Sequence, residues 1–519
     1  MIFVGIPLAF GVGIAGGLHP VAGAGLIGAA LGAMAIGLAP QSLAVKLLAA
    51  FLLLTVVQTA LGFVKFEPVR GASIGNLVVA AMAWNWALIG YYRGQFFRTT
   101  PFNFTLTIPL LIIPLLSIFS TDVFRDVDAY SVLGNTIHLK NLCVSFVGFF
   151  MVTQTLNTKK ELKHLFIFIL FLFSLATLLS LPDALDVKGH WRDGRTAGPM
   201  GDQINTWAAF LNEISAFFFL SLFLTQGRQW LKAILLVVLA AMAVSLVTTY
   251  SRMGMLGFGL GLAGSLLLSF RGNGKVPIAL PGILGVGMLL LVTAISPQVV
   301  ENVAERFSLS GFDKKEERTS TTFETRLNRF SGDRLEIWKG ALRIFEENPV
   351  FGGGFNIVRH RGHEFHRKGK AQPPHSMYMG QLADGGLVLF GAWGIFFLAL
   401  GRTLYRGWRH TAKVGDRLGQ VLCGGALISL LCFLQNGLTS DQISTNARMC
   451  LIATLWGIAA TYSLRFAPGT RETWSTPAGR GAAPPPASER WQEWRSRPAR
   501  DPWRERLLKN HLRGRNQRR

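Results

Sequence analysis

The chain has 519 residues, of which 50% are hydrophobic and only 16% are charged, and this combination excludes an ordinary soluble domain of that length. The apolar residues fall into continuous runs of about 17 to 23 residues, the length that crosses about 30 Å of hydrocarbon as a helix. The formal net charge of +23 would suggest nucleic-acid binding in a soluble protein, but the basic residues stand in short connections and at the C-terminal end, so we expect no nucleic-acid partner.

The apolar runs predict an all-α polytopic membrane protein. They are continuous and do not alternate between apolar and polar residues, so helices are favoured over a β-barrel. The first two runs are rich in Gly and Ala and are compatible with two crossings or with one short hairpin, so we expect twelve to fourteen transmembrane helices. The expected spans are residues 2–18, 21–38, 43–64, 73–92, 104–120, 142–157, 164–181, 206–225, 230–249, 253–270, 276–295, 379–401, 418–436 and 447–464.

Lys and Arg predict the orientation of these spans, because short basic connections stay in the cytoplasm. With fourteen spans, the strongly basic connections and both termini fall on one side. Residues 182–205, the turn at Ser251-Arg252 and the long loop 296–378 then face the opposite side. The basic residues used here are Arg93, Arg98, Lys159, Lys160, Lys163, Arg228, Lys232, Arg271, Lys275, Arg402, Arg406, Arg409, Lys413 and Arg417.

The long loop is predicted to be partly helical. Leu335, Trp338, Leu342 and Phe345 recur at helical spacing and indicate an amphipathic helix. The Pro- and Arg-rich tail is expected to be disordered, and it is either a topology anchor or a contact for anionic membrane lipids. The expected organisation is N-terminal membrane helices in 1–140, core membrane helices in 141–295, the large loop in 296–378, C-terminal membrane helices in 379–465 and a basic cytoplasmic tail in 466–519.

Two kinds of pattern resemble binding motifs only in their letters. Gly11-x-Gly13-x-x-Gly16 and Gly259-x-Gly261-x-x-Gly264 lie inside apolar runs and open no strand–helix unit, so we attribute them to close helix packing. His360, His363 and His366 lack the HExxH spacing of a zinc site. We therefore expect neither a metal nor a cofactor.

Four residues at the predicted outer surface are candidates for chemistry. Arg195 precedes the span 206–225, and Arg334 begins the amphipathic helix. Arg252 lies between two apolar runs with almost no loop, where an arginine needs an anionic partner or an aqueous cavity unless it snorkels to the interface. His375 follows two prolines directly before the span 379–401, and its imidazole can accept a hydroxyl proton near neutral pH, although a plain interfacial histidine is the alternative.

These residues stand in a series of motifs that resembles the O-antigen ligase and polymerase superfamily over roughly residues 140–465. The order and spacing of the motifs, and their placement on one face of the membrane, carry the resemblance. Met253 departs from it, because the family often has a small residue after Ser-Arg. The motifs are Gly194-Arg195-Thr196-Ala197-Gly198 with Asn205, Tyr250-Ser251-Arg252, Arg334-x-x-x-Trp338, Asn348-Pro349-x-x-Gly352-x-Gly354, His375-Ser376-x-Tyr378 and Asp384-Gly385-Gly386.

The resemblance implies a GT-C-like, inverting, metal-independent glycosyltransferase of the bacterial inner membrane with its active site facing the periplasm. Such an enzyme moves a glycan from a polyprenyl-diphosphate carrier to a hydroxyl of lipid A-core, of a glycan repeat or of a protein. Arg195, Arg252 and Arg334 would stabilise the diphosphate, whose negative charge grows as the glycosidic bond breaks, and His375 would take the acceptor proton. The residues expected to support them are Asn205, Ser251, Ser376, Tyr378 and Asp384.

Three alternatives remain open on the sequence. A polymerase that extends a chain of repeats and a protein O-oligosaccharyltransferase would use the same chemistry. A transporter or flippase of a lipid-linked substrate would also suit arginines within the membrane. Transporters more often carry internal repeats of similar length, and we see none in the sequence.

Overall fold

The computed structural model describes residues 41–60, 74–94, 96–124, 131–184, 204–271, 334–365, 373–441, 443 and 447–467. All of them belong to one compact unit, and they form helices and the segments that join them. The predictions for spans 2–18, 21–38 and 276–295 and for the tail lie outside the described residues. The elements are α3 Leu43–Ala60, α4 Ile74–Arg93, α5 Phe102–Thr107, the short π-helix η1 Ile108–Ile112, α6 Ile113–Phe124, α7 Val132–Thr155, α8 Lys159–Ala184, α9 Ile204–Leu224, α10 Gln229–Val247, α11 Arg252–Arg271, α15 Arg334–Glu347, α16 Ile357–Phe365, α17 Met377–Val414, α18 Arg417–Asn436 and α19 Ala447–Phe466.

The described part of the chain contains nine helical segments that are long and apolar enough to cross a membrane, which confirms the all-α polytopic membrane class. Each corresponds to an expected span, from Phe102–Phe119 to Arg448–Phe466. Two boundaries differ most: α7, expected over 142–157, already begins at Val132, and α17, expected over 379–401, continues to Val414. The extra turns of α17 carry Arg402, Arg406 and Arg409, whose long side chains can keep their charges at the interface while their stems cover apolar surface.

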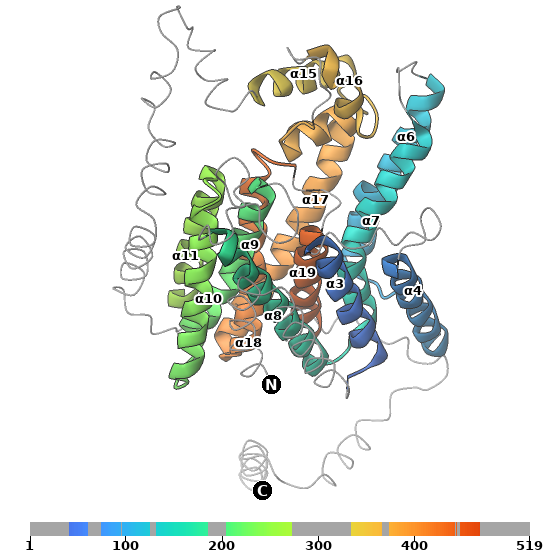
Figure 1. Ribbon diagram of the computed structural model, residues 1–519. Coiled ribbons are helices and arrows are strands. Elements are labelled where there is room, and N and C mark those ends of the chain that lie inside the picture. Colours follow the sequence, from blue (N-terminus) through green and yellow to red (C-terminus); the bar gives the residue numbers. More distant parts are fainter. Residues whose placement is uncertain are drawn as a thin grey trace, which may run out of the picture. The chain divides into compact units, whose positions relative to one another are not determined.

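Helix α9 forms the centre of the bundle and is buried along almost its whole length. It packs against α10, α11 and α18, and its aromatic side chains also meet those of α8 (Figure 1). Aromatic contacts fill these interfaces: the rings of Phe173 and Phe210 lie 4.0 Å apart between α8 and α9, and those of Phe219 and Phe258 lie 5.2 Å apart between α9 and α11. In a bilayer, such packing replaces the hydrophobic drive that holds soluble cores together.

Glycines let α11 approach its neighbours closely. A Cβ at Gly261 would lie 2.9 Å from Ser215 Oγ of α9, and one at Gly264 would lie 3.2 Å from Ile428 of α18. The close-packing interpretation of this glycine pattern is therefore confirmed for these two positions, whereas Gly259 faces open space. The pattern Gly11-x-Gly13-x-x-Gly16 lies outside the described residues.

Polar contacts mark one end of the bundle as the basic end. Lys159 Nζ lies 3.3 Å from Asp416 Oδ2, and Arg417 binds the side chain of Gln226. Arg465 donates to the Asn157 side chain at 3.0 Å. The connections between α7 and α8, α9 and α10, and α17 and α18 thus lie together, as the positive residues predict.

Helices α15 and α16 pack against the beginning of α17, away from the basic end (Figure 1). The predicted amphipathic helix is present as α15, but its expected apolar face is wrong. Its buried side chains are Ile337, Ala341 and Ile344, of which Ala341 and Ile344 pack with α16 and α17, whereas Leu342 is 38% exposed. The apolar surfaces of α16 and α17 determine which face of α15 is buried, because helical spacing alone allows several overlapping apolar stripes on α15.

Candidate functional site

The turn between α10 and α11 positions Arg252. Tyr250 has a φ of 53°, in the left-handed region that non-glycine residues rarely occupy. Ser251 is buried, and its Oγ accepts a hydrogen bond from Gly254 N at 3.3 Å, which caps α11. Arg252 is therefore the half-buried first residue of α11, at a helix N-terminus that favours negative charge.

Arg334 occupies the equivalent place on α15, as its first residue, and is also half-buried. Burial lowers the pKa of Arg334, and the positive charge of Arg252 lowers it further. The structure thus brings together two guanidinium groups that are 82 positions apart in the sequence, counting from 252 to 334. Two neighbouring positive charges at helix N-termini favour binding of an anion.

His375 stands directly before α17 in a strained turn with a φ of 48°. Ser376 Oγ accepts from Met379 N at 3.5 Å and donates to Gly437 O at 3.3 Å, so the next residue caps α17 and joins it to the turn after α18. The Trp338 indole donates to Pro374 O at 3.0 Å, which ties the same turn to α15. A strained backbone fixed from two sides is typical of a functional position.

The electrostatic environment keeps the His375 imidazole neutral. Burial, followed by the positive charge of Arg334, lowers the pKa of His375 to about 4. Arg252, Arg334 and His375 therefore form a series in which each group acts on the next. A neutral imidazole beside two guanidinium groups can accept a proton at neutral pH while the arginines hold an anion.

Asp384 supports the site from a break in α17. Gly386 has a φ of 61° and interrupts the helix, so the chain there pairs with the segment before α16. Gly353 N donates to Ala383 O at 2.6 Å, and Leu387 N donates to Pro349 O at 2.9 Å. Asp384 Oδ1 accepts from Ile357 N at 3.1 Å and so holds the N-terminus of α16.

At this break, Gly352 and Gly386 of two predicted motifs stand where no side chain would fit. A Cβ at Gly352 would lie 2.5 Å from the backbone nitrogens of Gly385 and Gly386. A Cβ at Gly386 would lie 2.5 Å from the Val350 carbonyl. Two backbones meet here, and side chains would push them apart.

Of the other predicted residues, the structure describes Tyr378 and Asn205 but not Arg195. Tyr378 donates its hydroxyl to Leu434 O at 2.7 Å and therefore holds α17 to α18. Asn205 is half-buried in the first turn of α9. Arg195 lies outside the described residues, so its proximity to Arg252 remains a prediction.

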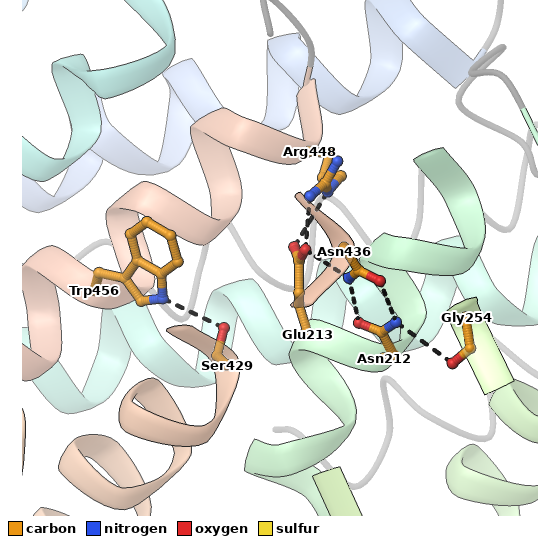
Figure 2. Close-up of polar contacts among 7 residues, drawn as sticks. All are labelled: Asn212, Glu213, Gly254, Ser429, Asn436, Arg448 and Trp456. Atoms are coloured by element: carbon orange, nitrogen blue, oxygen red, sulfur yellow. Dashed lines mark hydrogen bonds and ion pairs between the residues drawn. The ribbon is translucent and has the colours of Figure 1, made fainter. Parts of the chain in front are cut away.

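Sequence reasoning missed a buried ion pair below this site. Glu213 of α9 and Arg448 of α19 are 0% and 1% exposed, and their side chains approach to 2.6 Å (Figure 2). It also missed Asp441, in the connection between α18 and α19, where burial raises the pKa to about 6 although the charges of Arg359 and Arg448 oppose the rise. An acidic residue within span 206–225 and an arginine within span 447–464 are the signals that could have identified the pair.

One comparison with known proteins gives a match. Residues 235–394 match the family model described as O-antigen ligase. This range includes Arg252, Arg334, His375 and Asp384, whereas Arg195 and Asn205 precede it. No curated protein sequence matches the chain significantly. The matched segment is thus similar to a membrane glycosyltransferase or ligase family, and the described helices make the chain a multi-pass membrane protein.

Proposed function

We propose that this protein transfers a glycan from a polyprenyl-diphosphate carrier to an acceptor hydroxyl, with inversion at the anomeric carbon and without a metal. The observation that carries the proposal is the series Arg252, Arg334 and His375, in which the two arginines and the neutral imidazole lie close enough to influence one another. It falls within the segment that matches the O-antigen ligase family.

In this reaction the arginines stabilise the leaving group. The acceptor oxygen attacks the anomeric carbon as the bond from that carbon to the diphosphate oxygen breaks. The departing polyprenyl diphosphate keeps the electron pair, and Arg252 and Arg334 stabilise its growing negative charge, with Arg195 as the third expected donor. Guanidinium groups can neutralise the diphosphate in the role that a metal plays elsewhere.

His375 receives the proton of the acceptor hydroxyl. Its neutral imidazole has a free lone pair, and the Ser376 cap and the Trp338 contact fix the backbone on both sides of it. Binding of the diphosphate offsets the positive charge of Arg334, so the imidazole becomes a stronger base when the donor is present. The site therefore couples donor binding to proton acceptance.

The function can be tested with purified protein in detergent and a polyprenyl-diphosphate-linked glycan. Lipid A-core, a glycan repeat and a serine-containing peptide are offered separately as acceptors, with EDTA present. We expect one acceptor to gain the glycan with inverted anomeric configuration, and free polyprenyl diphosphate to accumulate in equal amount. Lipid A-core as the acceptor would identify a ligase, and the repeat would identify a polymerase.

The His375→Ala variant is the matched control for background transfer. Failure of all three acceptors, together with movement of the donor across a proteoliposome bilayer, would replace the enzyme by a transporter. Loss of transfer in EDTA that Mg²⁺ restores would reject the metal-independent mechanism.

The site is proposed to face the periplasm, with the basic end in the cytoplasm. Leu342 of α15 is 38% exposed and Val414 at the end of α17 is 59% exposed, whereas the four native cysteines are buried or half-buried. Leu342→Cys should react with a membrane-impermeant maleimide in cells with a permeabilised outer membrane, and Val414→Cys should react only after lysis. The same pattern for both variants would overturn this orientation.

A further inference from the structure

A buried polar cluster joins α9, α18 and α19 next to the proposed site, and it consists of Asn212, Glu213, Asn436 and Arg448 (Figure 2). Arg448 binds Glu213 through two bonds, from Nε to Oε2 at 3.1 Å and from Nη2 to Oε1 at 2.6 Å. Asn436 Nδ2 donates to Glu213 Oε1 at 3.1 Å and to Asn212 Oδ1 at 2.9 Å. All four side chains are buried, so the cluster fixes three helices with directional bonds in a low-dielectric interior.

One side of the polar cluster reaches the turn that carries Arg252. Asn212 Nδ2 donates to Gly254 O in the first turn of α11 at 3.4 Å (Figure 2). Gln435, the neighbour of Asn436, donates from Nε2 to Met253 O at 3.3 Å. The first turn of α11 is therefore bonded to α9 and to the end of α18.

The other side reaches the turn that carries His375. Asn436 is the last residue of α18, and the carbonyls that follow it receive the start of α17. Met377 N donates to Gly437 O at 2.9 Å and to Ser440 O at 3.2 Å, and Ser376 Oγ donates to Gly437 O at 3.3 Å. The position of Asn436 thus sets where α17 begins.

Stability alone does not account for such a cluster. A buried ion pair stabilises the fold little more than well-packed apolar residues of similar size would, because both charges lose their hydration. Hydrogen bonds of fixed direction do fix the relative positions of the helices that they join. The polar cluster lies between the α11 turn and the α17 turn, which are the two places whose separation the proposed transfer depends on.

We infer that the polar cluster is a positioning device for the transfer reaction, holding the turn of His375 at the working distance from the turn of Arg252. The inference rests on the proposed function for its catalytic consequence. None of the four side chains is assigned contact with the substrate. They act through the two turns, so their loss should lower the rate of the chemical step and leave donor affinity unchanged.

Two variants test this. The double variant Glu213→Leu/Arg448→Met removes both charges at once and replaces them with apolar side chains of similar size, which buried pairs often tolerate. Asn436→Ala keeps the ion pair but removes the amide that connects it to α18. In both variants we expect kcat to fall by about 10- to 100-fold, the effect of misplacing reacting groups by about 1 Å, while the donor dissociation constant stays within about threefold.

Ser429→Ala is the matched control. Ser429 Oγ accepts a bond from the Trp456 indole at 3.3 Å, which is another buried contact between α18 and α19 (Figure 2). This variant should lower the unfolding temperature but keep the wild-type kcat. A fall in kcat that follows the unfolding temperature across all the variants would indicate a structural role only.

Hydrogen exchange gives a readout that does not depend on turnover. The amide of Met377, which is bonded to Gly437 and Ser440, should exchange faster in both cluster variants and at the wild-type rate in Ser429→Ala. If the wild type transfers no glycan but the cluster variants still exchange the Met377 amide faster, the proposed function is wrong. The structural connection from the polar cluster to the turn of His375 is then still supported. An active wild type whose cluster variants keep both kcat and exchange rates would overturn the inference, as would failure of both cluster variants to fold.

Discussion

Replacing Arg334 by glutamine removes a positive charge that acts directly on His375. Burial is the larger cause that lowers the pKa of His375 from 6.5 to about 4, and the charge of Arg334 is the smaller one. Burial persists in the variant, so the pKa should recover less than half of that difference. We expect a rise of about one pH unit, equivalent to about 1.4 kcal/mol.

A higher pKa of His375 moves the loss of transfer rate to a higher pH. Only the neutral imidazole accepts a proton, so the transfer rate falls as the pH drops through the pKa of His375. In the wild type, kcat/KM should stay level from neutral pH to near the low pKa of the free enzyme. In Arg334→Gln the decline should begin about one pH unit higher, in addition to a lower overall rate from weaker donor binding.

The assay is the pH profile of kcat/KM, because this ratio reports the ionisation of the free enzyme. Arg334→Lys is the control, since it keeps the charge but loses the planar fork, so its rate should fall without movement of the acid limb. An acid limb at the same pH in Arg334→Gln and the wild type would refute the electrostatic link. If the decline of kcat/KM at low pH moves equally in Arg334→Gln and Arg334→Lys, the cause is a structural change and not the loss of charge.

The remaining predictions concern single residues. His375→Ala should lose about 10²- to 10⁴-fold in transfer rate yet bind the donor normally, and equal losses in both would assign the residue to binding. Arg252→Ala should weaken donor binding in a titration, with partial recovery in Arg252→Lys; a wild-type donor affinity in Arg252→Ala would exclude its contact with the diphosphate. Gly386→Ala should lower stability in detergent by about 1 to 3 kcal/mol, because its φ is 61° and its Cβ would meet the Val350 carbonyl. Gly391→Ala, which faces open space in the same helix, should not be destabilised, and equal melting temperatures of the two glycine variants would contradict the strained break.

The local pattern of the sequence was sufficient to predict the membrane spans and the basic connections between them. A membrane-crossing helix satisfies its own backbone hydrogen bonds, so its length and apolarity are properties of one segment. The segments from Phe102–Phe119 to Arg448–Phe466 were therefore predicted within about five residues, except at the start of α7 and at the far end of α17. The glycine pattern in α11 was likewise attributed correctly to helix packing at Gly261 and Gly264.

Which residues meet across the bundle was decided only by the tertiary structure. The resemblance grouped Arg252, Arg334 and His375 by role, but no pattern in the sequence gave their proximity. In the structure α15 packs on α17, and the charge of Arg252 at the start of α11 acts on Arg334. The buried face of α15 could not be predicted, because an amphipathic stripe is chosen by its partner helices. The Glu213–Arg448 pair depends in the same way on α9 and α19 approaching one another. Such contacts join residues on different helices, up to 235 positions apart for Glu213 and Arg448, and no periodicity within one segment encodes them.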